Sequence, residues 1–436
     1  MARTTARRPR ASSPKRSSPE TEPRPRRRYG SPVTLISELD LPEFDYTDSS
    51  LRGQRYHDTM AGLRRQGWLA ASPLAYFVLD REASSFFLRT KSATFPGMKI
   101  AELFGIDDGP LREEMERNIL HVNGPQHRRL RNLVNPSFTP RAADRWRPRM
   151  RSFLEDLWGA VGQGDGCEFV EAFAKPYPSL TIAAFMGAPL SDAPRLHHWS
   201  GMIQRQFDAP SLMSDRPAIE QAVVEFYAYC YELMAQGRSD PGDDLISTLL
   251  SAEAEGDRLS DVECVNLVLN VLIGGVDTTQ SQLAQAIRLF CEHPDQWALL
   301  AQRPEELAPA AVEEVLRFEP ITPFTARILL EDVEYRDVTF PEGTVVMVSA
   351  VTANRDPDLT SFDITADRTG AKPLTFGAGI HFCLGVNLAR AELQEALAFL
   401  APRMPALRAD GEPVFESIHG IYGMAELPIA WGGSPA

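Results

Sequence analysis

Apolar residues recur at intervals of three and four along most of the chain, the spacing that places them on one face of an α-helix. The segments with this pattern are 53–66, 111–119, 125–134, 140–162, 176–186, 217–236, 260–291, 293–302, 305–318 and 386–401. Short apolar runs typical of strands are fewer, namely 73–79, 326–330, 344–350 and 426–431. The pattern predicts a mainly α-helical protein with a small β-rich part.

Composition narrows the class of protein further. The 436 residues are 43% hydrophobic, 24% charged and 9% aromatic, which is ordinary globular usage and enough for a large core. The five cysteines are widely spaced and form no CxxC pair, which favours a reducing, cytoplasmic setting over a disulfide or zinc framework. No uninterrupted apolar run reaches the roughly 18 residues that a membrane-spanning helix needs, so we expect no transmembrane segment.

Charge is unevenly distributed along the chain. The first 28 residues hold ten basic and two acidic side chains, whereas the remainder holds 35 basic and 57 acidic ones. Residues 1–30 are rich in Arg, Ser and Pro, which predicts a disordered basic tail before a folded domain at 31–436. A transit peptide, or a tether to nucleic acid or an anionic membrane, is a less favoured role for this tail. The acidic body repels phosphate backbones, so we expect it to bind no nucleic acid.

The strongest chemical signal is the run FGAGIHFCLG at 376–385, directly before a helical pattern that begins near Val386. Three glycines around Cys383 predict a tight loop whose backbone closely approaches another group. The N-terminus of the following helix would direct its N–H groups and positive dipole end at the sulfur, which favours a thiolate. A thiolate is a nucleophile or a metal ligand, whereas a lone cysteine is more often buried and inert.

This run resembles the haem-binding loop of the cytochrome P450 family, F-G-x-G-x-H-x-C-x-G. All six fixed positions match: Phe376, Gly377, Gly379, His381, Cys383 and Gly385. The resemblance implies that Cys383 is the axial ligand of a haem b (iron protoporphyrin IX) and favours O–O cleavage. It also implies the cytochrome P450 fold, a helical triangular prism with a small sheet-rich lobe, as one haem domain over 31–436.

Two glycines, Gly274 and Gly275, lie inside the helical segment 260–291, where each costs about 1 kcal/mol relative to Ala. Their missing side chains would leave room for a flat cofactor, and the Thr278 hydroxyl can bond the Gly274 carbonyl and open the helix locally. An acid next to a Thr is otherwise equally typical of a solvated helix face. The run resembles the family's A/G-G-x-D/E-T motif, which implies that Asp277 and Thr278 deliver protons during oxygen activation.

Glu314 and Arg317 lie three residues apart on one predicted helix, a spacing that usually marks a weak surface ion pair. Their position about sixty residues before the cysteine loop matches the family's E-x-x-R signature. The resemblance implies a structural role for this pair, bracing the cysteine side of the haem site.

A buried haem leaves two propionate groups that need cations or hydrogen-bond donors. His127 and Arg131 lie at i and i+4, so both can point the same way, and they resemble the family's H-x-x-x-R. Arg327 and His381 also stand where the family places propionate partners. Each of the four, taken alone, is nearly as well explained as a solvated cation.

The resemblance implies a haem-thiolate monooxygenase that hydroxylates or epoxidises a lipophilic small molecule with O2. No flavin or NAD fingerprint and no iron–sulfur cysteine set is present, so two electrons must come from partner proteins. Without a membrane anchor, the chain resembles bacterial systems that use a ferredoxin and a ferredoxin reductase. We expect Arg128 and Arg129 to form a docking patch for the ferredoxin, and the protein to be a monomer.

Two alternatives keep the haem: a peroxide-using peroxygenase, and a non-catalytic haem-thiolate sensor or accessory protein. Peroxygenases of this family typically lack the acid–Thr pair, and a sensor needs no proton relay, so the joint presence of Asp277, Thr278 and Cys383 favours a monooxygenase. A helical ligand-binding protein without haem is the plainest alternative. By family analogy, we expect the substrate pocket to be lined by Phe95, Met98, Ile100, Leu103, Phe104, Ile203, Phe207, 321–324 and 418–422.

Overall fold

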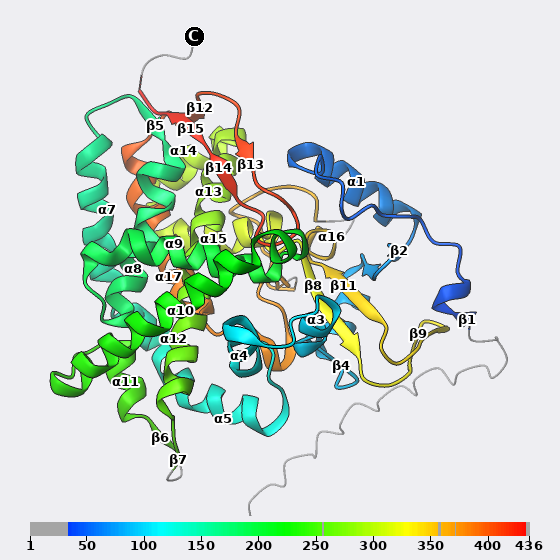
Figure 1. Ribbon diagram of the computed structural model, residues 1–436. Coiled ribbons are helices and arrows are strands. Elements are labelled where there is room, and N and C mark those ends of the chain that lie inside the picture. The colour runs from blue at the N-terminus through cyan, green and yellow to red at the C-terminus, as the bar shows by residue number, and fades with distance from the viewer. Residues whose placement is uncertain (1–33, 255–256, 356–358, 371, 433–436) are drawn as a thin grey trace, which may run out of the picture.

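The computed structural model describes residues 34–254, 257–355, 359–370 and 372–432, so the predicted tail at 1–30 lies outside the described residues. Most of these residues are helical, as the patterning predicts (Figure 1). The α-helices are α1 (Gly53–Gln66), α2 (Arg81–Arg89), α3 (Met98–Leu103), α4 (Gly109–Arg117), α5 (Gly124–Val134), α6 (Pro140–Asp144), α7 (Arg147–Val161), α8 (Pro176–Met186), α9 (Ala193–Gln204), α10 (Ala209–Ser239), α11 (Leu245–Ser251), α12 (Asp261–Gly275), α13 (Asp277–Glu292), α14 (Pro294–Gln302), α15 (Pro304–Phe318), α16 (Ala350–Asn354) and α17 (Val386–Leu400).

The strands are short and form five small sheets among the described residues. The largest has the order β2-β3-β11-β8-β4, with β2 (Leu69–Ala71), β3 (Tyr76–Val78), β11 (Val345–Ser349), β8 (Phe324–Leu329) and β4 (Ala93–Thr94). The others are β1 (Thr34–Leu35) with β10 (Val338–Phe340) and β9 (Val333–Tyr335); β12 (Arg408–Ala409) with β15 (Pro428–Ala430) and β5 (Gly166–Glu168); β13 (Val414–Phe415) with β14 (Met424–Glu426); and β6 (Glu253–Ala254) with β7 (Asp257–Arg258).

The molecule divides into a helical side and a sheet-rich side. In Figure 1 the helices α7 to α15 and α17 fill the left of the view, while α1, the five-stranded sheet and β9 lie on the right. The sheet combines strands from near the N-terminus with β8 and β11 from the later half of the chain, and β11 pairs in parallel with β3 and antiparallel with β8. The predicted mainly α architecture with a small β-rich lobe is confirmed.

The centre of the helical side is built from helices that are buried on several faces. Every residue of α8 after Pro176, except Leu180, is buried, and so is most of α12 and α13. The segment Asp261–Glu292 is long and apolar enough to span a membrane by length and composition, yet 61% of its most apolar window is buried inside the protein. It is the core helix of this fold, which carries the site described below.

Element boundaries differ from the patterning where local geometry intervenes. The predicted helix at 140–162 is divided between α6 and α7, and the predicted helix at 260–291 is divided between α12 and α13 at Val276. The sequence pattern did not indicate α2, α3, α9, α11 or α16. It indicated β3 and β15, within the runs 73–79 and 426–431, but missed most other strands of two or three residues. Such strands are too short to show a period, and their positions are set by pairing with distant segments.

Candidate active site

The cysteine loop connects the sheet side to α17. The Cys383 N–H donates to the Phe376 carbonyl at 3.0 Å, which closes the loop on itself. Gly377 and Gly379 have φ values of 68° and 76°, and a Cβ on Gly379 would lie 2.8 Å from the Leu88 carbonyl oxygen of α2. Both positions therefore require glycine, as the motif predicts. Gly385 lies directly before α17, and its carbonyl accepts from the Ala389 N–H at 2.9 Å.

The electrostatic environment of Cys383 contains opposing contributions. Burial raises the pKa of the Cys383 thiol, whereas a hydrogen bond from the Gly385 backbone and the positive charges of Arg131 and Arg390 lower it. The net direction is upward, so these groups alone do not ionise the thiol. A metal cation bound to the sulfur would deprotonate it, which is consistent with a ligand role for this cysteine.

Glu314 and Arg317 are not the surface pair that their spacing suggests, because both side chains are at most 2% exposed. The Arg317 guanidinium donates twice to the Glu314 carboxylate, each at 2.7 Å, and also to the carbonyls of Asn354, Leu359 and Ser361. Arg368 approaches the same carboxylate at 3.1 Å. The pair joins α15 to the segment that leads into the cysteine loop.

The four predicted propionate ligands come together beside the loop. The imidazole rings of His127 and His381 meet edge to face at 4.7 Å, and Arg131 donates to the Phe382 carbonyl at 2.5 Å. Arg327 of β8 is 4% exposed, and its guanidinium donates to the Ala326 carbonyl at 2.9 Å. Burial lowers the pKa of Arg327 to about 10. Burial, and then the positive charges of His127, Arg327 and Arg131, lower the pKa of His381 to about 3.

This cluster fits a buried dianionic group. Within the part of the chain that the structure describes, no carboxylate bonds to His127, Arg131, Arg327 or His381. His127 Nε2 and His381 Nδ1 are buried without a hydrogen-bond partner. Buried cations and unsatisfied donors without a counter-ion are costly. The carboxylates of two haem propionates would supply these missing partners, so the residues present fit the expected cofactor.

His121 is a member of this cluster that sequence reasoning missed. It is 6% exposed, stacks on Phe95 with ring centroids 5.6 Å apart, and meets Phe207 edge to face at 6.1 Å. Its Nε2 is buried without a partner, and burial lowers the pKa of His121 to about 4. The clue in the sequence is the short distance from His127, but His121 belongs to no motif of fixed spacing.

The helix break lies where the glycine pair predicts it. α12 ends at Gly275, α13 begins at Asp277, and the Thr278 hydroxyl donates to the Gly274 carbonyl at 2.6 Å. Apart from its own helix backbone, a Cβ on Gly274 would meet no heavy atom of the described residues within 4 Å, so the space beside it is open. Gly275 is different, because a Cβ there would overlap the Cδ1 atom of Ile182 in α8. The prediction that Gly275 makes room for a cofactor is therefore corrected: it permits close packing of two helices.

The two residues expected to deliver protons lie side by side but have different partners. While Thr278 bonds to the end of α12, the Asp277 carboxylate accepts a hydrogen bond from Ser200 of α9. Burial raises the pKa of Asp277, whereas the Ser200 hydrogen bond and the charge of His197 lower it. Ser200 and His197 were not predicted, because they lie about eighty residues before Asp277 and form no motif with it.

A further buried acid connects this helix to the cysteine side. Glu392 of α17 is 1% exposed, and its Oε2 accepts from the Thr279 hydroxyl at 3.3 Å. Burial raises the pKa of Glu392 well above its usual value, although hydrogen bonds from Thr279 and Thr181 oppose this effect. The contact fixes α13 against the helix that follows Cys383.

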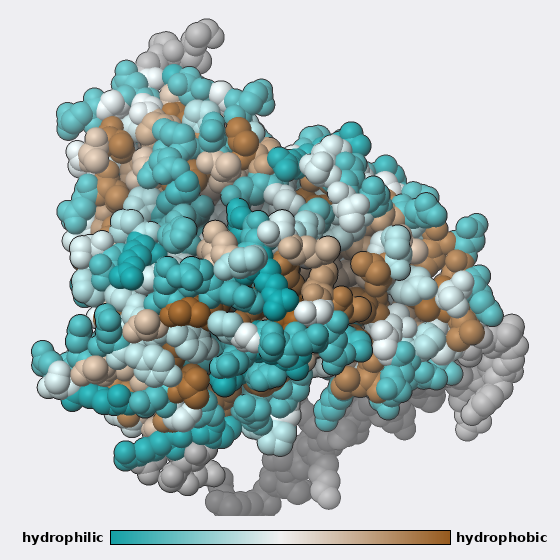
Figure 2. All heavy atoms as spheres, viewed as in Figure 1, coloured by the Kyte–Doolittle hydropathy of each residue, from teal (hydrophilic) through white to brown (hydrophobic). Residues whose placement is uncertain are grey.

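The expected walls of the substrate pocket are only partly supported. Met98, Ile100 and Phe104, together with Met202, are partly buried and pack against a small core cluster that includes Ala101 and Leu212. Figure 2 shows apolar side chains gathered in a hollow near the middle of the visible face, where α3 and the N-terminal end of α10 lie in Figure 1. By contrast, Tyr422 is fully buried in the core of the sheet side, and its hydroxyl accepts from the Gly53 N–H at 2.6 Å. Tyr422, at the end of the predicted wall 418–422, is therefore a core residue and does not line a pocket.

A basic hollow of about 540 Å³ lies over the outer side of the cysteine loop. It is lined by Phe376–Ala378, Gly379 and Phe382 of the loop together with Arg81, Ser85, Arg89, Glu313, Lys372, Pro373, Leu374 and Arg390. Ile380 and Phe382 are 58% and 39% exposed beside it. Of the predicted docking patch, Arg128 is exposed, whereas Arg129 is paired, since it donates to Glu263 at 2.6 Å and to the Arg258 carbonyl at 2.9 Å.

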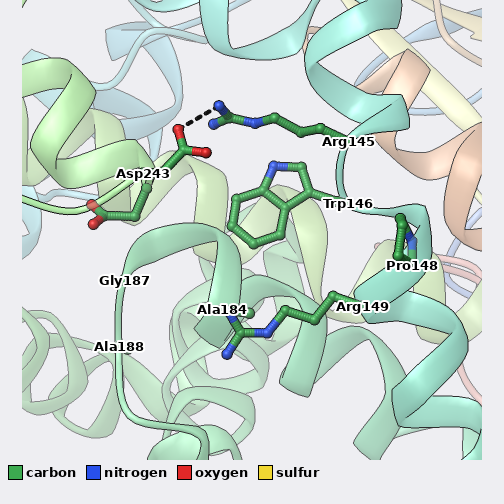
Figure 3. Close-up of a pocket in the computed structure, with 9 residues that line it drawn as sticks. Arg145, Trp146, Pro148, Arg149, Ala184, Gly187, Ala188 and Asp243 are labelled. Carbon is green, nitrogen blue, oxygen red and sulfur yellow. Dashed lines mark hydrogen bonds and ion pairs between the residues drawn. The ribbon is translucent and has the colours of Figure 1, made fainter.

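A second hollow, of about 460 Å³, lies between the start of α7, the end of α8 and the segment before α11. Figure 3 shows Arg145 reaching across it to Asp243, a contact of 2.6 Å, with the Trp146 indole beneath. The predicted site residues do not line this hollow. The ion pair fastens one surface segment to another and offers no candidate chemistry.

Comparisons with known proteins agree with this site. Residues 77–302 and 297–400 match the family described as Cytochrome P450. The chain is 37% identical over 409 residues to luteothin monooxygenase of Streptomyces thioluteus, covering 92% of this chain and 98% of that protein. It is 36% identical over 336 residues to mycinamicin IV hydroxylase/epoxidase of Micromonospora griseorubida, covering 74% and 83%.

Solved structures give the same result. The crystal structure of CalO2 superposes with a TM-score of 0.82 at 31% identity, covering 90% of this chain and 99% of that one. The EryK mutant in complex with erythromycin B superposes with a TM-score of 0.76 at 31% identity, covering 88% and 97%. With these relatives, the cysteine loop and the helix break, the chain belongs to the cytochrome P450 family and is a haem-thiolate monooxygenase.

Proposed function

We propose that this enzyme hydroxylates or epoxidises a lipophilic small molecule with O2 and two electrons from a ferredoxin and its reductase. The observation that carries the proposal is the cluster of two arginines and two histidines beside Cys383, which has no carboxylate partner among the described residues. In this proposal Cys383 holds the iron of haem b, and His127, Arg131, Arg327 and His381 hold its propionates. When bound, the haem supplies the oxygen-activating redox chemistry.

The protein contributes positioning and protons. The open space at Gly274 accommodates a flat cofactor and a small ligand, since apart from the helix backbone no atom of the described residues lies within 4 Å of a Cβ placed there. The Thr278 hydroxyl beside this space and the partly buried Asp277 carboxyl hold the proton that oxygen activation consumes. Delivery from fixed groups in a water-poor pocket limits the loss of oxygen as hydrogen peroxide.

The names of the relatives support a secondary metabolite as the substrate. Their names include luteothin monooxygenase, mycinamicin IV hydroxylase/epoxidase and erythromycin C-12 hydroxylase. The apolar cluster of Met98, Ile100, Phe104 and Met202 supports a lipophilic skeleton. We further propose that the enzyme works as a cytoplasmic monomer.

The basic hollow over the cysteine loop supports a ferredoxin as electron donor. Arg89 and Lys372 line it, and Ile380 and Phe382 add exposed apolar surface beside it, a combination that suits an acidic partner. We expect the double charge reversal Arg89→Glu with Lys372→Glu to raise the apparent KM for ferredoxin severalfold without changing the absorption spectrum. The exposed Arg65→Glu in α1 is the control, and unchanged reduction kinetics in the double variant would exclude this docking site.

Turnover distinguishes the proposed activity from its alternatives. Purified holoenzyme is supplied with a surrogate ferredoxin, reductase, NADPH and a panel of lipophilic compounds, and in parallel with hydrogen peroxide alone. The proposal predicts oxygenated product in the first reaction. Product formed efficiently only with peroxide would indicate a peroxygenase, and tight binding without product in either reaction would indicate a sensor or accessory protein.

A further inference from the structure

α9 crosses the helix break and contacts it at two positions. Ser200 reaches the Asp277 carboxylate, and its Oγ also lies 3.3 Å from the Leu272 carbonyl oxygen of α12. One turn earlier on α9, His197 Nε2 lies 2.8 Å from Gln280 Oε1, three residues beyond Asp277. The acid of the family motif is thus held by a different helix from the one that carries it.

The Ser200 hydroxyl has one proton and two acceptors within reach. When Asp277 is ionised, that proton is donated to the carboxylate. When Asp277 is protonated, its own O–H can donate to Ser200 Oγ, and the hydroxyl proton turns to the Leu272 carbonyl. Ser200 is fully buried, so an unmade bond in either state would be costly. Both protonation states of Asp277 therefore retain hydrogen-bond partners without movement of a heavy atom.

Charged groups around Asp277 come from two neighbouring elements. His197 faces it from α9, and Glu416 faces it from the segment after β13. Lys175 and Arg205 in turn act on Glu416. His197 is half-buried on α9, and its positive charge acts on the Asp277 carboxyl.

We propose that Ser200 and His197 of α9 are positioning residues that set the orientation and the protonation of Asp277, so that α9 controls the proton supply to the active site. This inference rests on the proposed function of Asp277 as a proton donor. The hydroxyl of Ser200 holds the carboxyl in both protonation states, and the imidazolium of His197 favours its ionised form.

The direct test is the titration of Asp277 in the full-length holoenzyme by infrared difference spectroscopy. The carbonyl band of the protonated Asp277 carboxyl is assigned by its loss in Asp277→Asn, because Glu114 and Glu392 contribute other bands of buried acids. We expect Ser200→Ala and His197→Gln each to raise the apparent pKa of this band by about one unit. Both substitutions remove a group that favours the ionised form.

Matched controls use the same substitutions on nearby helices. Ser179 of α8 is 2% exposed and donates to the Lys175 carbonyl at 2.7 Å, and His198 is exposed on α9 beside His197. Ser179→Ala and His198→Gln should leave the band unchanged. Ser200→Thr restores the hydroxyl and should restore the wild-type pKa, which separates loss of the hydroxyl from a general effect on folding. An unchanged band in Ser200→Ala, or an equal shift in Ser179→Ala, overturns the proposal.

The second measurement is product coupling, the amount of oxygenated product formed per NADPH consumed. It distinguishes failure of the α9 inference from failure of the proposed monooxygenase function. Ser200→Ala should release more hydrogen peroxide per NADPH. The pH above which coupling declines should also be higher in this variant, since Asp277 then keeps its proton to a higher pH. Wild-type turnover combined with unshifted coupling in Ser200→Ala overturns the inference alone. Absence of wild-type turnover combined with the infrared shift overturns the proposed function while the control of Asp277 by α9 stands.

Discussion

In the proposed assignment, cofactor binding depends most on Arg131 and Arg327, the cationic side chains beside the cysteine loop. Arg327 is 4% exposed in β8 and faces no carboxylate within the described residues. An arginine in this position destabilises the protein unless an anion completes the site. Its pKa of about 10 still leaves it charged at neutral pH. The guanidinium is therefore available as a fixed positive charge for a haem propionate.

Arg327→Gln should accelerate the transfer of haem to an acceptor apoprotein about tenfold to a hundredfold, because one charge-assisted pair is lost. Arg336→Gln is the control, since Arg336 is paired with Asp80 and Glu82 in the same lobe. Equal rates of haem loss from the Arg327→Gln variant and the wild type would contradict a propionate role for Arg327.

For single residues, the sequence predicted those site residues that lie close together in the chain. Three groups have members that are near one another in the chain: the ten residues of the cysteine loop, His127 with Arg131, and Glu314 with Arg317. Their spacing alone therefore identifies them as candidate site residues. His121, Ser200 and His197 act through contacts with distant or unpatterned positions. The sequence also did not predict that Glu314 and Arg317 are buried, since their spacing alone suggested a surface pair.

In the proposed mechanism, proton delivery depends on the break between α12 and α13. Glycine is present at its two positions for different physical reasons. Gly274 borders open space, whereas Gly275 lies against Ile182 of α8. The helix period predicted one long apolar segment correctly, and the Thr278 hydroxyl bond was predicted from the four-residue spacing. Packing against α8 decided the role of Gly275, and no pattern within 260–291 contains that information.

The glycine pair gives a prediction with an internal control. Gly275→Ala should destabilise the protein by about 1–3 kcal/mol, because the added methyl group overpacks the contact with Ile182. Gly274→Ala should leave the free energy of unfolding within about 1 kcal/mol of wild type, since alanine favours the helix. Denaturant unfolding of the holoenzyme checks both, and the penalty of Gly275→Ala should shrink in the background Ile182→Ala. Equal stabilities of the two alanine variants would contradict the assigned roles.

The same break provides a test of proton delivery. Thr278→Ala removes the hydroxyl that bonds to Gly274, and oxygen consumption should then yield more hydrogen peroxide and less product. Thr278→Ser keeps the hydroxyl and should retain most of the coupling. Product and peroxide per NADPH are measured together, and undiminished coupling in Thr278→Ala would count against Thr278 as a proton-delivering residue.

At the scale of the whole molecule, a buried ionic network joins the helical side to the sheet side. Glu319, at the end of α15, is 1% exposed and contacts His57 of α1 at 2.9 Å, Arg288 of α13 at 2.9 Å and Arg355 at 3.2 Å. Burial alone raises the pKa of Glu319, but these three partners outweigh it and lower the pKa to about 2. The network therefore stabilises the fold only while Glu319 is ionised.

The sign of its pH dependence follows from this lowered pKa. Because the unfolded chain binds the proton more readily, the stabilisation is complete above about pH 4.5 and is lost as the pH falls towards about 2. Glu319→Gln should cost about 3–5 kcal/mol at neutral pH and flatten the stability profile in this acidic window. The exposed Glu305→Gln is the control, and an equally steep profile in Glu319→Gln would contradict this assignment.

The central claim is that Cys383 binds haem iron as a thiolate, and the carbon monoxide difference spectrum of the dithionite-reduced protein tests it most directly. We predict the strongly red-shifted Soret band from which the family takes its name, and its loss in Cys383→Ser. A band at the position of neutral or histidine ligation in the wild-type protein would contradict thiolate ligation, and absence of any haem band would contradict the cofactor assignment itself.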